Sequence, residues 1–192
     1  MTTPDITSAL RYRSSSRAFD PRPVEPEKIA ALVEAFRWAP SSQNKQPWRL
    51  IVARTEQARA GWDTALDPGN QAWAPRAPLK LVVIANPEEQ PDHHGQQRCL
   101  VDGGLALHAL LVQACAMGLN VRAMAGWNQD KVRTTFDIPS SCLVVALVAA
   151  GYPCPVDALP AEVQQKEARA RVRRDPTEIV FYDRFGASGA AM

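Results

Sequence analysis

The sequence predicts an α+β fold that forms one domain across residues 1–192. Helical periodicity and short apolar runs alternate along the chain, and one apolar segment is much longer than the others. Neither an internal repeat nor a linker interrupts this pattern. A chain of this length buries about 70% of the surface that its unfolded form exposes, which is enough for one sizeable core.

The first half of the chain is expected to alternate helices with buried strands. Pro26 suits the first turn of an amphipathic helix that ends before Pro40. Its apolar residues recur at three- and four-residue spacing: Ile29, Leu32, Val33 and Phe36. A second helix is predicted over 56–66. The apolar runs 48–53 and 79–85 are bounded by prolines and polar residues, which is typical of buried strands.

The second half begins with the longest apolar segment. The run 101–117 is apolar nearly all round, so it predicts a central buried helix, and Gly118 is its expected left-handed stop. A subunit of this size rarely encloses such a helix on every side, so part of its surface is expected to face a partner chain. Strands are predicted at 120–125 and 142–150, with a helix at 129–136 between them.

Composition excludes several classes of function. With 22 Lys and Arg against 20 Asp and Glu, the net charge is +2, which gives no general reason to expect nucleic-acid or membrane partners. No uncharged run approaches bilayer length and the first residues lack a secretory signal, so a cytoplasmic protein is expected. No metal site is expected, because the four cysteines are widely separated and adjacent His93 and His94 alone do not make one.

A polar loop, 39–48, separates the first predicted helix from the first predicted strand. Loops of this kind carry binding groups, and the hydroxyl and amide side chains here can hydrogen-bond a heteroatom-rich ligand such as a flavin or nucleotide. Pro40 and Pro47 limit the backbone freedom that binding would otherwise remove. An ordinary Asn/Ser turn between helix and strand is the alternative interpretation.

A basic segment, Arg13-Ser14-Ser15-Ser16-Arg17-Ala18-Phe19, precedes the first predicted helix. If the segment is extended, Arg13, Ser15 and Arg17 point the same way and form a cation, hydroxyl, cation row. Arginine supplies planar, permanently charged donors that suit phosphate. A solvated basic turn is the alternative here.

A third motif lies near the C-terminus, where the basic cluster 171–174 precedes an apolar strand-like run. In residues, order and spacing, the three motifs together resemble the FMN-dependent nitroreductase family over most of the chain. The matching residues are Arg13, Ser15, Arg17 and Phe19, then Pro40, Ser41, Asn44, Gln46, Pro47 and Trp48, then Arg174, Pro176, Glu178, Ile179 and Val180.

The resemblance implies a nitroreductase-like mixed β-sheet flanked by helices, with a C-terminal segment exchanged across a homodimer. Two FMN molecules are then expected at the dimer interface, each touched by both subunits. One chain contributes the basic segment and a C-terminal arginine over the phosphate, and the other contributes the polar loop. The cofactor-binding residues implied are Arg13, Ser14, Ser15, Arg17, Pro40, Ser41, Ser42, Asn44, Gln46, Asn70, Met124, Ala125, Gly126, Arg173 and Arg174.

Two of these assignments are less direct. The segment 123–127 resembles the family loop that lies on the flavin, where Gly126 lets the backbone approach closely. Some members carry a glutamate before this glycine, but this chain has Ala125, which leaves ring contacts to the backbone. Asn70 matches a flavin-contacting asparagine of some relatives with loose spacing, and it equally suits a turn at 67–70.

The activity implied is ping-pong hydride transfer from NADH or NADPH, through FMN, to an electron-poor acceptor such as a nitroaromatic, a quinone or an enal. Arg17 is expected near the pyrimidine end of the flavin, where a positive charge favours the anionic reduced form. No dedicated acid–base side chain is expected. Trp73 and Trp127, each near a flavin-edge segment, are the aromatic residues expected in the acceptor pocket.

Other functions remain open at this point. Within the family, the chain could be a specialised member such as a semialdehyde reductase or a dehalogenase. In a second class it is an FMN-binding or flavin-sensing module without turnover. In a third class the cluster 169–174 makes it a nucleic-acid adaptor, which predicts a colourless protein with salt-sensitive binding.

Overall fold

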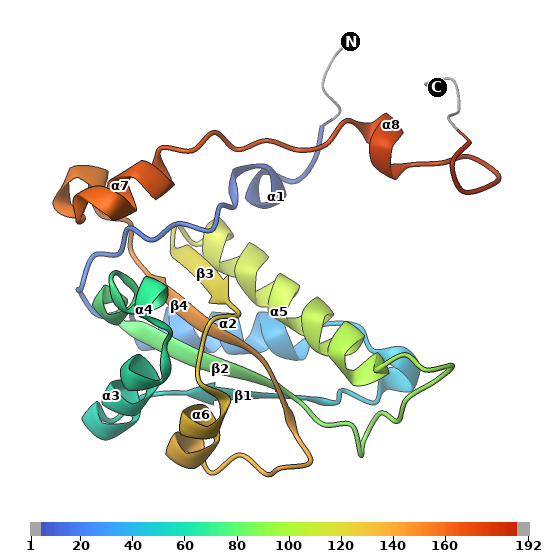
Figure 1. The fold of residues 1–192 in the computed structure, drawn as a ribbon, viewed down its shortest axis with the longest axis horizontal. Helices are drawn as coiled ribbons and strands as arrows, with labels where there is room; N and C mark the ends of the chain where they lie inside the picture. Colours follow the sequence, from blue (N-terminus) through green and yellow to red (C-terminus); the bar gives the residue numbers. More distant parts are fainter. Residues whose placement is uncertain (1–4, 188–192) are drawn as a thin grey trace.

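A four-stranded sheet forms the centre of the molecule in the computed structural model, which describes residues 5–187 (Figure 1). Its strand order is β1-β2-β4-β3, and all three neighbouring pairs are antiparallel. The strands are β1 (Trp48–Val52), β2 (Leu79–Ala85), β3 (Asn120–Met124) and β4 (Leu143–Gly151). The α+β class is therefore confirmed, and the strand pairs within the described part of one chain include no parallel pair.

Helices cover both faces of this sheet. The helices are α1 (Ser8–Tyr12), α2 (Pro26–Arg37), α3 (Glu56–Ala65), α4 (Pro68–Gln71), α5 (Arg98–Ala116), α6 (Gln129–Phe136), α7 (Ala161–Glu167) and α8 (Pro176–Ile179). Three short 3-10 turns join them: η1 (Ser42–Asn44), η2 (Ala74–Arg76) and η3 (Val156–Ala158). Helices α2 and α5 pack together against one face, and α3 and α6 pack together against the other. The expected helices and strands of the central fold are thus present.

The alternation of side chains along β2 divides the core into two halves. Leu81 and Val83 belong to the apolar cluster under α2 and α5, whereas Val82 and Ile84 belong to the cluster under α3 and α6. Every residue of β2 is buried. A strand that is covered on both faces has a nearly continuous apolar sequence, as the run 79–85 does.

Helix α5 begins three residues before the predicted start and ends as predicted, since Gly118 adopts a left-handed φ of 73° after it. Ala106, Leu110 and Ala114 are fully buried against the sheet, whereas Val101 and Leu105 are exposed on the opposite face. Among the described residues, α5 is the one helix whose length and composition would suit a membrane. Here it packs on the sheet as a core helix.

The C-terminal region differs from its prediction. The stretch 158–172, whose Ala, Glu, Gln and Arg content suits either a solvated helix or a mobile lead-in, contains the helix α7. The prediction of a strand-like run after Arg174 is wrong, because residues 176–179 form the helical turn α8. Asp175 accepts a hydrogen bond from the Thr177 amide at 3.0 Å, and Glu178 accepts one from the Asp175 amide at 3.0 Å. This capping box, with proline at the first helical position, starts a helix where apolar composition alone suggests a strand.

Candidate functional site

The segment from Arg13 to Phe19, here called the N-terminal strap, lies against the start of β3, just beyond the C-terminal end of α5 (Figure 1). Asn120, the first residue of β3, donates through Nδ2 to Ser16 Oγ at 3.1 Å and to the Ala18 carbonyl at 2.7 Å. Phe19 is fully buried in the core below. The strap is therefore fixed in place although it belongs to no strand of the sheet.

Glu167, at the end of α7, holds the middle of the strap. Its carboxylate accepts hydrogen bonds from Ser16 Oγ at 2.7 Å, from the Arg17 amide at 3.0 Å and from Arg17 Nη1 at 3.1 Å. The side chains of this ion pair are 18% exposed at Arg17 and 11% exposed at Glu167. Screening by water is weak at that burial, so the carboxylate both orients Arg17 and ties α7 to the strap.

The predicted row of cation, hydroxyl and cation is formed only in part. Arg13 Nη1 donates to Ser15 Oγ at 3.4 Å, so these two side chains lie together as expected. Arg17 is instead engaged by Glu167. Ser14 is half-buried.

Arg122 of β3 adds a cation that the motifs do not include. Its Nη1 donates to the Ser15 carbonyl, and its buried Nε has no hydrogen-bond partner among the described residues. Arg122 and Arg17 lie over the same ring of Trp73, at 5.4 Å and 5.9 Å from its centroid. Burial lowers the pKa of Arg122 and the charge of Arg17 lowers it further, while Glu167 opposes them. Arg17, Arg122 and Glu167, here called the cation cluster, thus carry more positive than negative charge, and the Arg122 Nε–H has no acceptor among the described residues.

Gly126 lies beside this cluster in the loop after β3. Its carbonyl accepts hydrogen bonds from Asn70 Nδ2 at 3.0 Å and from the Asp67 amide at 3.2 Å. A Cβ at this position would lie 2.8 Å from Asp67 Oδ2 and 3.0 Å from Asn70 Nδ2, so glycine lets these two side chains pack closely against the loop. Asn70 is placed in the short helix α4, where its amide holds the Gly126 loop, and Ala125 is exposed beside it.

Two side chains expected near the flavin are part of the core. Met124 is 5% exposed and Trp73 is 1% exposed, so neither offers a surface for stacking. Met124 can reach a ligand only through its backbone. Trp127 is half-buried and stays a candidate for the acceptor pocket.

The polar loop, 39–48, is largely held by hydrogen bonds between its own residues. Ser41 Oγ accepts from the Gln46 amide at 2.9 Å, and Gln46 Nε2 donates to Asn44 Oδ1 at 3.0 Å. The backbone is left-handed at three residues that have a Cβ: Gln43 (φ 53°), Asn44 (φ 55°) and Gln46 (φ 50°). Each such residue costs about 1 kcal/mol or more, and such strain concentrates at functional sites.

Contacts from outside hold this loop to the body of the protein: Arg49 Nη1 of β1 donates to the Gln46 carbonyl at 3.3 Å, and the Asn86 amide donates to the Pro47 carbonyl at 2.7 Å. A further contact comes from α5. The Ser42 amide donates to Asp102 Oδ2 at 3.2 Å, and Asp102 is 3% exposed on α5. A carboxylate that is this deeply buried is costly without hydrogen bonds, so its position in a mostly apolar helix serves the loop.

The strap and the polar loop lie at opposite ends of α5 (Figure 1). From Asp102 to Ala116 the helix rises about 21 Å, at 1.5 Å per residue. Within the described residues, no hydrogen bond or ion pair joins the two groups. The structure therefore brings the predicted site residues together as two separate sets within a single chain.

The C-terminal arm, residues 168–187, leaves the body after α7 and extends past α1 (Figure 1). Arg171 Nη2 donates to the carbonyls of Arg11 and Arg13, both at 2.8 Å. Arg173 bonds only the adjacent Val172 carbonyl, and Arg174 is exposed. Within the described chain, Arg171 rather than either expected arginine reaches the strap.

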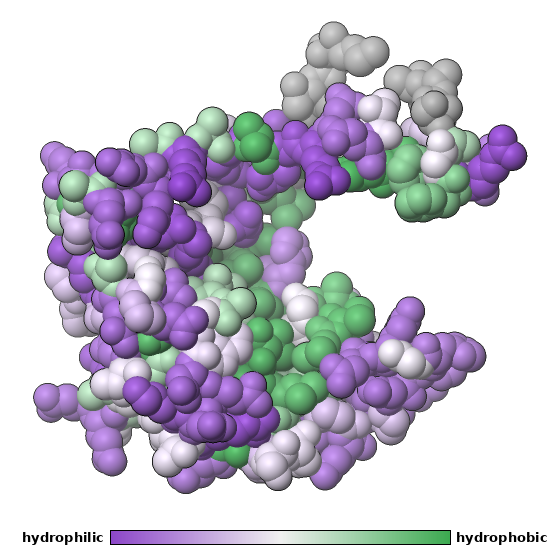
Figure 2. Space-filling model, viewed as in Figure 1, coloured by the Kyte–Doolittle hydropathy of each residue, from purple (hydrophilic) through white to green (hydrophobic). Residues whose placement is uncertain are grey.

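Much apolar surface is uncovered along the arm and α5. The exposed side chains on the arm include Val172, Ile179, Val180, Tyr182 and Phe185. Figure 2 shows hydrophobic residues over α5 in the hollow below the arm, where Val101 and Leu105 are exposed. Contiguous apolar surface of this kind marks an interaction site.

Four residues that hold the strap or the polar loop are not among the residues that match the family: Asp102, Arg122, Glu167 and Arg171. Two of them carry a readable signal, because Asp102 is the one acid within the apolar run 101–117 and Arg122 is the one charge within the run 120–125. Glu167 lies in a charged, polar stretch, so nothing in its neighbours distinguishes it, and Arg171 belongs to the basic cluster 171–174 but not to the residues that match the family.

Comparison with known proteins gives matches over most of the chain. The model of the nitroreductase family matches residues 10–66 and 56–152. A relative from Thermus thermophilus named NADH dehydrogenase is 30% identical over 180 residues, covering 78% of this chain and 87% of the relative.

Solved structures agree with these sequence matches. One described as an oxidoreductase containing FMN is 28% identical with a TM-score of 0.83, covering 97% of this chain and 96% of that chain. A nitroreductase family protein from Clostridium difficile is 26% identical with a TM-score of 0.74, covering 92% of this chain and 96% of that one.

Proposed function

This chain belongs to the nitroreductase family, and we propose that it is an FMN-dependent oxidoreductase that uses NADH or NADPH to reduce small electron-poor acceptors. Nitroaromatics, quinones and enals are the acceptor classes proposed. The observation that carries the proposal is the cation cluster at the strap, in which Arg122 keeps a buried, unpartnered Nε beside Arg17.

The residues at the strap fit FMN. Arg13 and Ser15 lie together as a guanidinium and a hydroxyl, which is a donor set that suits a phosphate. Arg171 braces the strap from the arm by binding the backbone carbonyl of Arg13 and that of Arg11 at the end of α1. The Gly126 loop is fixed by its hydrogen bonds with Asp67 and Asn70 and leaves the small Ala125 exposed, so a flat ring can approach it without meeting a large side chain.

FMN, when bound, supplies the redox chemistry by accepting a hydride from the nicotinamide and passing it to the acceptor. The role of the protein is to bind and orient the cofactor and to set the charge around it. The guanidinium groups of Arg17 and Arg122 are fixed by Glu167 and by the Ser15 carbonyl, so they need no rearrangement to favour negative charge nearby. We assign no proton transfer to a side chain of this chain.

We further propose that the complete site needs two copies of the chain. The strap and the polar loop are separated by most of the length of α5, so a loop from a partner is required to bring both sets to one ligand. The exposed apolar surfaces of α5 and the arm supply the area that such a homodimer needs. The proposed location is the cytoplasm.

The spectrum of the purified protein tests this function. We expect bound FMN to give a yellow protein, and anaerobic addition of NADH or NADPH to bleach the flavin band, with recovery when a nitroaromatic or quinone is added. A yellow protein that neither nicotinamide reduces indicates the flavin-sensing alternative. A colourless protein that does not bind added FMN contradicts the proposal.

A further inference from the structure

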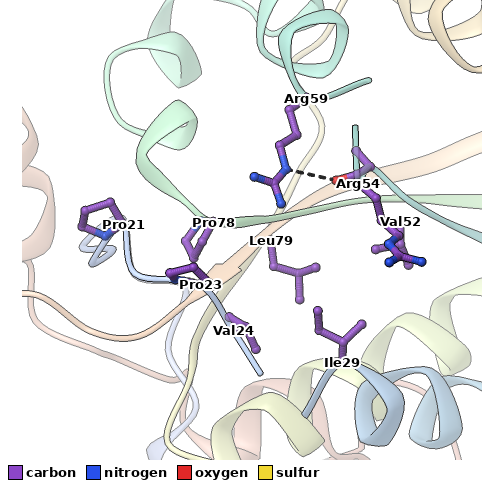
Figure 3. Close-up of a pocket in the computed structure, with 10 residues that line it drawn as sticks. Pro21, Pro23, Val24, Ile29, Val52, Arg54, Arg59, Pro78 and Leu79 are labelled. Atoms are coloured by element: carbon purple, nitrogen blue, oxygen red, sulfur yellow. Dashed lines mark hydrogen bonds between the residues drawn. The ribbon is translucent and has the colours of Figure 1, made fainter. Parts of the chain in front are cut away.

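A pocket of about 320 Å³ lies between the N-terminal end of α2 and the adjacent ends of β1 and β2 (Figure 3). Ten residues line it: Pro21, Pro23, Val24, Ile29, Val52, Ala53, Arg54, Arg59, Pro78 and Leu79. None of them belongs to the strap, to the polar loop or to the Gly126 loop. Its volume is at the lower end of the range of small-molecule sites.

The floor of the pocket is apolar and rigid. Val24 and Leu79 are buried in the core under α2 and α5, and Ile29 and Val52 pack against the same core. Figure 3 shows Pro21, Pro23 and Pro78 grouped on one side. Proline rings have few conformations to lose, so an apolar ligand would bind here at small entropic cost.

Two arginines occupy the opposite side of the pocket (Figure 3). Among the described residues, the Arg54 side chain has no hydrogen bond or ion pair, and the Arg59 side chain donates only through Nε, to the Ala53 carbonyl at 3.4 Å. The terminal nitrogens of both guanidinium groups therefore keep their donors free. No acidic residue is among those that line the pocket, so its charge is not neutralised from within.

We propose that this pocket binds a small hydrophobic carboxylate, such as an aryl carboxylate, with the ring against the prolines and aliphatic floor and the carboxylate toward Arg54 and Arg59. An arginine binds a carboxylate through two parallel N–H donors, which suits a monoanion. The apolar floor offers nothing to the remaining oxygens of a phosphate, which favours a planar carboxylate over inorganic phosphate.

Methyl NMR of the intact, FMN-loaded protein tests the site directly with benzoate as the probe. We expect saturable shifts of the methyl signals of Val24, Ile29, Val52 and Leu79. Benzamide has the same ring without the charge, and inorganic phosphate has the charge without the ring, so both are expected to shift these signals far less. Benzoate shifts that are absent or unsaturable, or that are confined to residues around the strap, overturn the proposal.

Variants separate this site from the redox site. Arg54→Ala and Arg59→Ala are each expected to weaken benzoate binding about tenfold, since each removes a charge-assisted donor pair. Arg37→Ala removes the same charge from an exposed pair with Glu34 on α2 and is expected to leave binding unchanged. The absorbance of bound FMN and the rate of nicotinamide oxidation stay at the wild-type level in all three variants. Equal benzoate affinity in the wild type and in Arg54→Ala/Arg59→Ala also overturns the proposal.

Discussion

The two ends of α5 hold their candidate site residues in different ways. At the C-terminal end, the strap is held by side chains from distant parts of the chain, namely Asn120, Arg122 and Glu167. At the N-terminal end, the polar loop bonds mainly to itself and to nearby strand residues, and Asp102 is its anchor on α5. The strap is therefore ordered by tertiary contacts, whereas the loop is ordered by local hydrogen bonds and a strained backbone.

This difference predicts where each end is vulnerable. Removing one distant side chain at the strap leaves buried charges without partners, and its effect on stability is therefore large. Removing one contact of the loop leaves most of its internal bonds in place, so the effect there is small. Four substitutions test the comparison, two at each end of the helix.

The largest effect is expected from Glu167→Ala. It leaves Arg17 and Arg122 close together without their shared counter-charge and removes the acceptor of Ser16, so the free energy of unfolding falls by about 3 kcal/mol. Urea unfolding followed by tryptophan fluorescence measures it. Glu167→Gln keeps an acceptor oxygen and is expected to lose less. A loss below about 1 kcal/mol for the alanine variant, the level of an exposed pair, contradicts the claim that this pair anchors the strap.

Arg122→Gln is expected to weaken FMN binding about tenfold, because it removes a charge and the unpartnered donor from the cation cluster. Fluorescence titration of the apoprotein with FMN measures the dissociation constant. Arg37→Ala, which removes an exposed charge from α2, serves as the control and should bind FMN as the wild type does. Unchanged affinity in Arg122→Gln refutes its assignment to the cofactor site.

At the loop end, Asp102→Ala is expected to lower the free energy of unfolding by about 1–2 kcal/mol, because the Ser42 amide loses its acceptor. Hydrogen exchange should speed up in the peptide that spans 40–47, with little change at the strap. Asp102→Asn retains an oxygen at this position and should recover part of the protection. If hydrogen exchange becomes faster at the strap as well as in the loop of the alanine variant, the loop is not anchored independently of the strap.

The smallest effect is expected from Gln43→Gly. Its φ of 53° is left-handed, so glycine relieves strain there, and the variant is expected to be more stable by less than about 1 kcal/mol. Ser42→Gly is the matched control, since the neighbouring φ is not positive and glycine there should destabilise the protein. Thermal unfolding of the pair measures the contrast. Destabilisation of equal size in both variants shows that the loop stores no such strain.

The same difference explains what can be predicted from the sequence. The central helices and strands follow from periodicity, and the polar loop and the strap are recognisable as motifs because their residues are neighbours in sequence. Glu167 and Arg171 act on the strap across more than 150 residues, so no local pattern predicts these contacts. Trp73 has an aromatic ring that could stack on a ligand, but tertiary packing buries this ring in the core, below the cation cluster.

The length of α5 has a further consequence for mixtures of defective chains. In the proposed dimer, a chain with a damaged strap can pair with a chain with a damaged loop, and this heterodimer combines the sound strap of one with the sound loop of the other. Such a pair contains one intact centre and one doubly defective centre. Two inactive preparations should therefore regain activity when they are unfolded and refolded together, by complementation between subunits.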